Sequence, residues 1–158
     1  MADLSTGLTQ ALVSSGQRDV QLVTFRIGDY EFGADVSDVR GIYHGLPMIP
    51  TPDAPDVLAG DVQICGERIS VFNLSSLYAN PESRATDWWI IVLNLLGGPV
   101  GFKVEKVTEV VRLKVSALAT VPNDEAHPLR NYVSAVAQHQ GRTIRLVDFT
   151  AMLKEHLQ

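Results

Sequence analysis

The sequence predicts a mainly β protein that ends in one helix. Three observations lead to this class. Many short apolar runs follow a period of two, regular turn signals separate them, and strands do not alternate with helices in a βαβ pattern. The chain has 158 residues, which fits one domain or two tightly fused small ones. All-β barrels or a sandwich are the architectures that fit.

The N-terminal segment of the chain lacks the period-two pattern. Residues 1–19 are mostly small and polar, so we expect a flexible N-terminal tail and a single folded unit over 20–157. β-rich runs then flank the turn pair Gly28-Asp29, which predicts a hairpin. The stretch from Val36 to Ile42 spaces its apolar residues by three and is ambiguous between a short helix and a bent strand.

The middle of the chain predicts a loop and two hairpins. Four prolines, at 47, 50, 52 and 55, remove ladder donors, so 45–60 is predicted to be an ordered loop. Asp53 and Asp56 in it are better explained by turn chemistry than as an acid/base pair. A hairpin turning at Gly66-Glu67 follows. The most apolar segment, "WWIIVLNLL", predicts a buried strand that turns at Gly97-Gly98.

The C-terminal part predicts further strands and the helix. Valines 107, 110 and 111 alternate only imperfectly, and Gln140-Gly141 marks a last hairpin. Asp148 is the expected N-cap of a helix, and that helix places Phe149, Met152, Leu153 and Leu157 on one face. The segments "FRIGDYEFGADV" and "LNLLGGPVGFKV" are compatible with a duplicated barrel, although they are not a detectable repeat.

Composition argues against several functional classes. The net charge is −5 and Lys and Arg do not cluster, so the electrostatic footprint of a nucleic-acid-binding protein is missing. The N-terminus lacks the features of a signal peptide, no polybasic or lipidation signal occurs, and the longest apolar run, 88–93, is too short to span a bilayer. We therefore expect a cytoplasmic protein, and the single cysteine fits a reducing compartment.

That cysteine, Cys65, raises the question of catalysis. A nucleophilic thiol needs a base in reach, and the four histidines (44, 127, 139 and 156) are distant in sequence and outside any catalytic signature. No metal-ligand spacing occurs, and no residue pattern indicates a cofactor. A free, mostly buried structural cysteine is the prediction, and a thiol-dependent enzyme is kept as an alternative. A further open choice concerns Trp88 and Trp89: one should face the core, and the other is either half-covered by the preceding loop or anchors a partner. Tyr30 and Phe32 are expected on the outer face of the first hairpin, and the same choice between packing and a partner is left open for them.

Four segments resemble, in order and near spacing, the CheW-like domain family. They are "LVTFRIGDYEFGADVSDVRGI", "IPTPDAPDVLAGDVQICGERISVFNL", "WWIIVLNLLGGPVGFKVEKVTEVVRL" and "YVSAVAQHQGRTIRLVDFTAML". The resemblance implies two SH3-like β-barrel subdomains packed side by side, with a groove between them. It also implies a non-enzymatic adaptor that couples methyl-accepting chemoreceptors to a CheA-type histidine kinase. The kinase's regulatory domain would meet the barrel ends, and the receptor tip would lie in the groove.

The sequence departs from the family pattern at a few positions. Cys65 stands where the family usually has arginine, and Asn73 and Ser75 stand where it has aspartate and a second arginine. If Cys65 and Asn73 are neighbours, the joint loss leaves no stranded charge, which would cost about 3–5 kcal/mol. Gly41 also replaces a long, often acidic residue. These departures motivate the alternative of a divergent member that binds one of the two partners, or a different one, in another motility or chemosensory pathway.

The resemblance implies a set of partner-binding residues in the groove and at the barrel ends. They are Val39, Arg40, Gly41, Gly60, Ile64, Cys65, Gly66, Asn73, Val107 and Val110.

Overall fold

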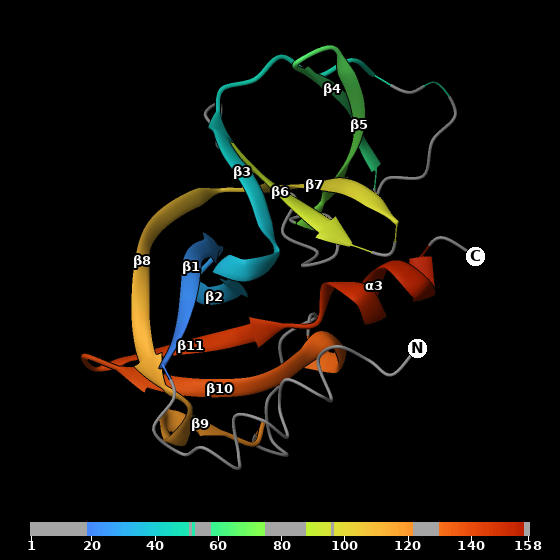
Figure 1. Cartoon of the computed structure of the whole chain (residues 1–158). Helices are drawn as coiled ribbons and strands as arrows, with labels where there is room; N and C mark the ends of the chain where they lie inside the picture. The colour runs from blue at the N-terminus through green and yellow to red at the C-terminus, as the bar shows by residue number, and fades with distance from the viewer. Residues whose placement is uncertain are drawn as a thin grey trace.

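Two β-sheets make up the body of the molecule, and a C-terminal helix lies between them (Figure 1). The computed structural model describes residues 19–50, 52, 58–74, 88–95, 97–121 and 130–156. The predicted N-terminal tail lies outside these residues except for Asp19, which begins the first strand. The mainly β class with one C-terminal helix is confirmed.

The eleven strands found in the described residues fall into two groups by sheet. The six-stranded sheet contains β1 (Asp19–Ile27), β2 (Tyr30–Asp35), β8 (Lys106–Lys114), β9 (Leu118–Ala119), β10 (Val133–His139) and β11 (Arg142–Val147). The five-stranded sheet contains β3 (Val39–His44), β4 (Leu58–Ile64), β5 (Glu67–Asn73), β6 (Trp89–Leu95) and β7 (Gly98–Val104). The short 3₁₀ helices are η1 (Val36–Asp38), η2 (Val115–Ala117) and η3 (Arg130–Tyr132), and the α-helix is α3 (Phe149–His156).

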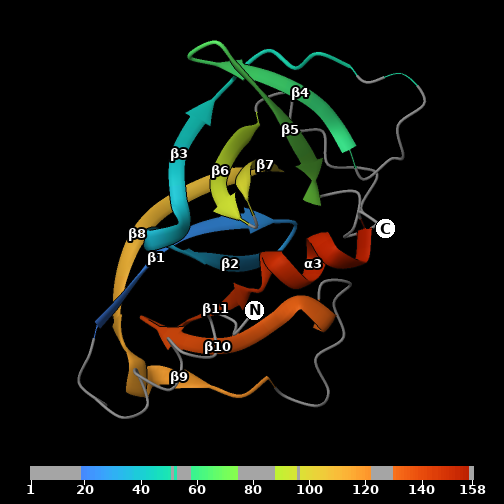
Figure 2. The same cartoon turned by 45° about the vertical axis from the view of Figure 1, so that its right-hand side comes forward.

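We call the six-stranded sheet the first barrel and the five-stranded sheet the second barrel. The first barrel takes strands from both ends of the chain. Strands β1 and β2 belong to it, η1 then carries the chain into the second barrel, and β8 returns it to the first (Figure 2). The ambiguous stretch from Val36 to Ile42 is therefore both of its alternatives in succession: one 3₁₀ turn followed by a strand. The barrels are not consecutive halves of the chain.

The two sheets nevertheless repeat one design. Their strand orders, β8-β1-β2-β11-β10 and β3-β6-β7-β5-β4, match strand for strand. In each sheet the third and fourth strands of this order are parallel and all other neighbours are antiparallel. The match aligns the two hairpin segments "FRIGDYEFGADV" and "LNLLGGPVGFKV" residue by residue, so the duplication suggested by the sequence is present in three dimensions.

Irregularities of the strands are duplicated too. Each sheet has a β-bulge at the same place: Thr108 is an extra residue of β8 opposite β1, and Arg40 is an extra residue of β3 opposite β6. The bulge at Thr108 explains why the valines of this segment alternate only imperfectly. Gly33 and Gly101 also correspond, and a Cβ at either position would lie 3.0–3.2 Å from a neighbouring side chain, so both are close-approach glycines.

Among the described residues, buried apolar side chains form three clusters, one within each barrel and one shared between them. The first barrel's own cluster is Val20, Leu22, Val111, Leu113, Ala137 and Ile144. The second barrel's is Val62, Ile69, Val71, Ile90 and Val92. The shared cluster draws side chains from β1, β2, β5, β6, β7, β10, β11 and α3. The two barrels are thus joined by a continuous core.

Strands β1 and β6 are buried on both faces because they serve two cores. Ile90 and Val92 point into the second barrel, whereas Ile91 and Leu93 point into the shared core. This explains the continuous apolar run in the sequence, since a strand buried on both faces needs no polar alternation. The expectation that Phe32 lies on an outer face was wrong: it is fully buried in the shared core, while Tyr30 packs against that core half-buried.

Helix α3 closes the shared core. Its predicted N-cap is confirmed, since the Asp148 carboxylate accepts a hydrogen bond from the Ala151 amide at 3.0 Å. Phe149, Met152 and Leu153 are buried, and Leu157 lies outside the described residues. The Phe149 ring is 6.2 Å from that of Phe25 in the first barrel and 4.6 Å from that of Phe102 in the second. One side chain therefore contacts both barrels.

The predicted turns mostly stand, with small shifts. Gly28-Asp29 and Gln140-Gly141 are the two-residue turns expected. The turn between β4 and β5 is Cys65-Gly66 rather than Gly66-Glu67, because Glu67 already pairs with Ile64. Gly98 likewise belongs to β7. Asp53 and Asp56 lie outside the described residues.

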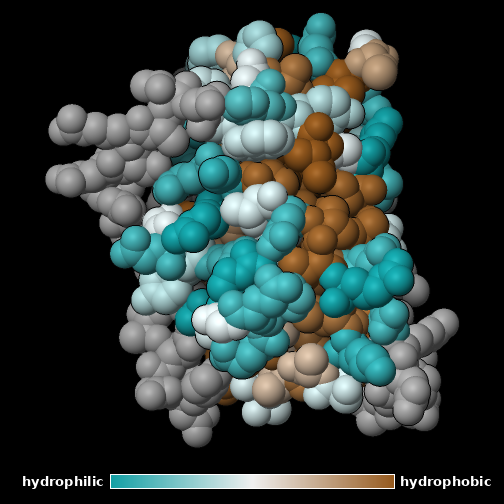
Figure 3. Space-filling view, turned by 90° about the vertical axis from the view of Figure 1, so that its left-hand side faces the viewer, coloured by the Kyte–Doolittle hydropathy of each residue, from teal (hydrophilic) through white to brown (hydrophobic). Residues whose placement is uncertain are grey.

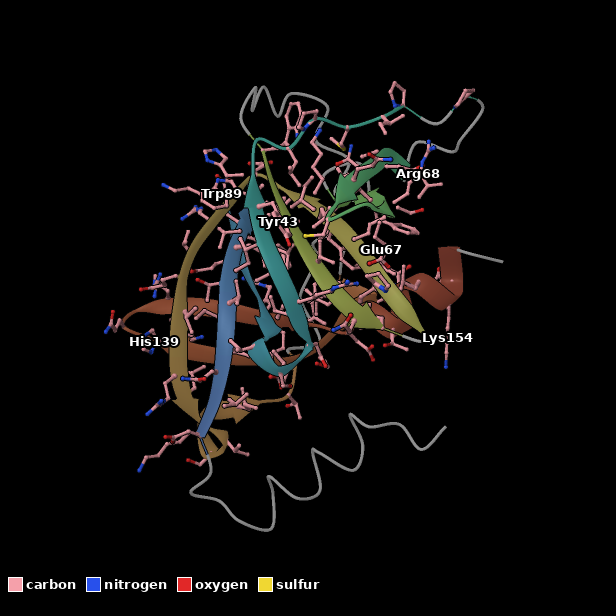
Figure 4. The ribbon with its side chains drawn as sticks, turned by 45° about the horizontal axis from the view of Figure 1, so that its top comes forward. Tyr43, Glu67, Arg68, Trp89, His139 and Lys154 are labelled. Carbon is pink, nitrogen blue, oxygen red and sulfur yellow. The ribbon has the colours of Figure 1, made fainter. Side chains whose placement is uncertain are left out.

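We expect Phe149→Ala to lower the free energy of unfolding by about 3–5 kcal/mol, because it leaves a cavity where the barrels meet. Urea denaturation followed by tryptophan fluorescence measures this. Lys154→Ala, on the exposed side of the same helix (Figure 4), is the control and should change stability by less than about 0.5 kcal/mol. A loss for Phe149→Ala no larger than for the control would contradict the shared-core interpretation.

Candidate functional site: the β3 seam, the β4–β5 turn and the β8 face

The ten residues predicted to bind partners occupy four places. Val39, Arg40 and Gly41 begin β3; Gly60, Ile64, Cys65 and Gly66 belong to the β4–β5 hairpin; Val107 and Val110 lie on β8; and Asn73 ends β5. Three features decide which of these places belong together: an ion pair, a set of close approaches by glycines, and a stripe of exposed apolar side chains.

Arg40 joins the start of β3 to the β4–β5 hairpin. It is the extra residue of the β3 bulge, and β3 is an edge strand of its sheet. A bulge at a sheet edge redirects the side chain that it carries. The Arg40 Nη2 donates to Glu67 Oε1 at 2.8 Å, and both side chains are a little over 40% exposed. Cys65 is two residues from Glu67, so a guanidinium lies beside the turn where the family usually carries one.

Gly41 has a steric reason to lack a long side chain. A Cβ at this position would lie 2.6 Å from the Tyr43 hydroxyl oxygen and 2.7 Å from its ring. Tyr43 packs against the second barrel's core, so its ring covers Gly41 along the strand. In this chain Tyr43 takes the space that a longer residue at 41 would need.

Gly60 is likewise explained by packing. Its φ is +140°, and a Cβ would lie 2.5 Å from the carbonyl oxygen of Ile49. Ile49 and Asp61 exchange two backbone hydrogen bonds, of 2.7 and 2.8 Å, which hold the loop against β4. Gly60 lets this loop cross the strand closely, and that is a structural role independent of any partner.

Cys65 is exposed, which corrects the expectation of a mostly buried thiol. It has φ 52° and Gly66 has φ 81°, the two positive values of a type I′ turn. The reason for the exposure is topological, since a residue at the tip of a two-residue hairpin turn points away from both strands. Among the described residues no three His, Cys, Asp or Glu side chains gather in a way that would hold a metal ion.

Cys65 and Asn73 are not neighbours. They flank β5 at opposite ends, about 20 Å apart at the usual rise of a strand. Asn73 pairs in register with Lys103 of β7, within the parallel contact. The premise that the two positions form one neutral pair was therefore wrong, and the changes at 65 and 73 are separate events.

An apolar stripe lies on the face formed by β3 and β8. Ile42 is 37% exposed and Val110 57%, and Val39 and Val107 are half-buried against the shared core. Figure 3 shows apolar atoms running down this side of the molecule. The sequence predicted three of these residues as partner-binding and missed Ile42. The ambiguity between helix and strand at 36–42 gave no prediction of the direction in which Ile42 faces.

Aromatic side chains continue this part of the surface. The exposed His44 ring stacks on half-buried Trp89, with ring centroids 4.2 Å apart and planes 6° apart. Trp88 faces the second barrel's core, and the Lys103 ammonium lies 4.8 Å from its ring centroid. Burial lowers the pKa of Lys103. The two tryptophans thus face opposite sides, as alternation requires, and Trp89 is the one that adjoins β3 (Figure 4).

The first barrel has a polar cluster that the sequence did not reveal. Glu31 is 7% exposed, and its carboxylate accepts hydrogen bonds from Arg142 Nη1 at 3.1 Å and from the Thr108 hydroxyl at 3.3 Å. Arg142 Nη2 also donates to Glu109. Arg142 thus bridges β2 and β8 from β11, and its hydrogen bond to Glu109 is the main cause that raises its pKa. Residues 111 apart in sequence form this contact, so no local pattern could have indicated it.

No helix in the described ranges is both long and apolar enough to cross a membrane.

Comparison with known proteins gives one consistent result. The model of the CheW-like domain matches residues 21–156. A probable chemotaxis protein CheW of Rhizobium etli is 25% identical over 149 residues, which cover 94% of this chain and 96% of that protein. The chemotaxis protein CheW of Rhizobium meliloti is 26% identical over 151 residues, or 93% and 94% of the two chains.

A solved structure confirms the architecture. The scaffolding protein TtCheW from Thermoanaerobacter tengcongensis superposes with a TM-score of 0.79, at 20% identity, over 87% of this chain and 94% of that one. The expected fold, two SH3-like barrels packed side by side with a C-terminal helix, is therefore confirmed.

The turn at Cys65 yields one stability prediction. A non-glycine residue in the left-handed region costs roughly 1–2 kcal/mol, and asparagine tolerates this region best. We expect Cys65→Asn to raise the free energy of unfolding by about 0.5–1 kcal/mol and Cys65→Val to lower it by about 1 kcal/mol. Paired urea titrations measure both. Equal stabilities for the two variants would show that the turn does not hold residue 65 in this conformation.

The polar cluster yields a second prediction. Arg142→Leu should lower the free energy of unfolding, because it leaves Glu31, which is 7% exposed, without its cation. The double variant Arg142→Leu with Glu31→Gln should recover most of this loss. Thermal and urea unfolding of the two variants test the claim, and no recovery in the double variant would mean that the stranded charge is not the cause.

Proposed function

This chain belongs to the CheW-like domain family, and we propose that it is a non-enzymatic chemosensory adaptor that couples methyl-accepting chemoreceptors to a CheA-type histidine kinase. The observation that carries the proposal is the family match, which spans 21–156 and therefore both barrels. The relatives matched over more than nine tenths of their length are named as chemotaxis proteins. An adaptor of this kind acts in the cytoplasm and needs no cofactor.

Two surfaces support the binding of two partners. The apolar stripe on β3 and β8 exposes Ile42 and Val110, and an exposed apolar patch on a folded protein is typical of a docking site. We assign this stripe to the receptor tip. The end of the second barrel carries the exposed Arg40–Glu67 ion pair beside the turn at Cys65, and we assign this end to the regulatory domain of the kinase.

A second candidate is a divergent adaptor that binds only one of these partners, or a different one. It is favoured by the position of Cys65 at an exposed turn, where the family usually presents arginine. A thiol cannot replace the five-donor fork of a guanidinium at a polar interface. Because Cys65 and Asn73 lie at opposite ends of β5, restoring Arg at 65 and Asp at 73 should be tested as two separate variants.

Separate binding titrations decide between the candidates. Calorimetry against the cognate kinase regulatory domain, and against a soluble receptor-tip hairpin, should show saturable binding of each. Val110→Asp should weaken receptor binding at least tenfold and leave kinase binding unchanged, because it places a charge in the apolar contact. Ser116→Asp, an exposed change in the neighbouring η2, is the control.

The outcomes separate cleanly. Binding to one partner alone would select the divergent adaptor. Binding to neither would remove the coupling function, and equal effects of the Asp variants at 110 and 116 would remove the stripe as the receptor site.

A further inference from the structure

The duplicated design of the two barrels allows their ends to be compared position by position. Glu67 of β5 corresponds to Arg142 of β11, since each follows a two-residue turn with two positive φ values. Arg40 is the bulge residue of β3, as Thr108 is of β8, and Glu109 follows Thr108. Each barrel end therefore has an arginine–carboxylate contact between equivalent strands: Arg142 of β11 with Glu109 of β8, and Arg40 of β3 with Glu67 of β5. The polarity is reversed, because the cation comes from β11 in the first barrel and from β3 in the second.

The two arginines differ in how completely they are used. Arg142 has two carboxylate partners, Glu31 and Glu109, and its side chain is 34% exposed. Arg40 has one, Glu67, through a single N–H donor. The position equivalent to Glu31 is Pro99 in β7, since the parallel pairing aligns Gly33 with Gly101. Proline has no side-chain acceptor, so the second barrel supplies no counterpart of Glu31.

The Arg40 side chain is also ordered before a partner binds. The bulge and the hydrogen bond to Glu67 fix the side chain, which lowers the entropy cost of ordering it on binding. Within the described residues, four of its five N–H donors have no protein acceptor, and 43% of the side chain is exposed. A guanidinium fork in this state matches a carboxylate bidentately.

We propose that Arg40 binds a carboxylate of the partner that docks at the end of the second barrel. In the first barrel the corresponding carboxylate is internal and belongs to Glu31. The partner is the regulatory domain of the CheA-type kinase, so this inference rests on the proposed function. Charge complementarity is the reason for expecting a carboxylate on the partner. Arg40 has one intramolecular acidic partner and lies at an exposed edge, so an acidic side chain of the partner fits it best.

Two variants test this against the wild-type chain with the cognate kinase regulatory domain, by calorimetry. Arg40→Gln should weaken binding about 10- to 100-fold, the range of a charge-assisted hydrogen bond at an interface. Pro99→Glu keeps Arg40 and supplies an internal carboxylate like Glu31. It should also weaken binding, about tenfold, because the internal acid competes with the partner's.

The controls match each change. Arg68→Gln removes the same charge from the β4–β5 hairpin, which Arg40 contacts through Glu67. Arg68 lies on the other face of β5, paired with Asp61 at 2.8 Å, and this variant should bind within about twofold of wild type. Pro99→Ala removes the proline without adding an acid and should also bind within about twofold. Figure 4 shows Glu67 and Arg68 at the start of β5.

Circular dichroism and thermal unfolding confirm that each variant is folded. If Arg40→Gln does not fold, the comparison of Pro99→Glu with Pro99→Ala decides alone. Wild-type affinity in Pro99→Glu, or in a folded Arg40→Gln, overturns the proposal and leaves the adaptor function standing. So does an equal loss in Arg68→Gln, which would indicate a general charge effect. No binding by the wild-type chain would instead count against the proposed function itself.

Discussion

The packing of Phe149 between Phe25 and Phe102 is the interaction on which the rest of the structure depends. Each barrel has a small core of its own, of five or six buried side chains, and neither is large for a unit of this size. The shared cluster is larger than both, and it includes residues from both barrels and from α3. Burial of this surface couples the barrels into one body and fixes the faces that they present outward.

This constraint explains where the functional surfaces lie. Strands β1 and β6 are occupied on both faces by cores, so they have little free surface for partners. The edge strands β3 and β8 are left with exposed residues, which produces the apolar stripe of Ile42 and Val110. In the described residues, arginine–carboxylate contacts lie at the ends of both barrels, through Arg142 in the first and Arg40 in the second.

Repetition of one barrel design makes small differences between the two meaningful. Arg142 forms ion pairs with two carboxylates, and it closes the first barrel over the buried Glu31. Arg40 is bound by one, at an edge and beside an exposed turn. Arg40 of β3 therefore places a guanidinium beside the β4–β5 turn that contains Cys65, although β3 and β4 are opposite edge strands of the sheet.

By itself, the sequence determined the local features: strand positions from period-two patterning, the Gly28-Asp29 and Gln140-Gly141 turns, the helix cap at Asp148, and the family through its ordered segments. These follow from backbone preferences and near neighbours. It could not determine that Phe32 is buried, or that Arg40 meets Glu67 and Arg142 meets Glu31. Those facts depend on which distant strands pair and where bulges shift the register. The shared hydrophobic core settles both, because burial is satisfied only by the assembled pair of barrels.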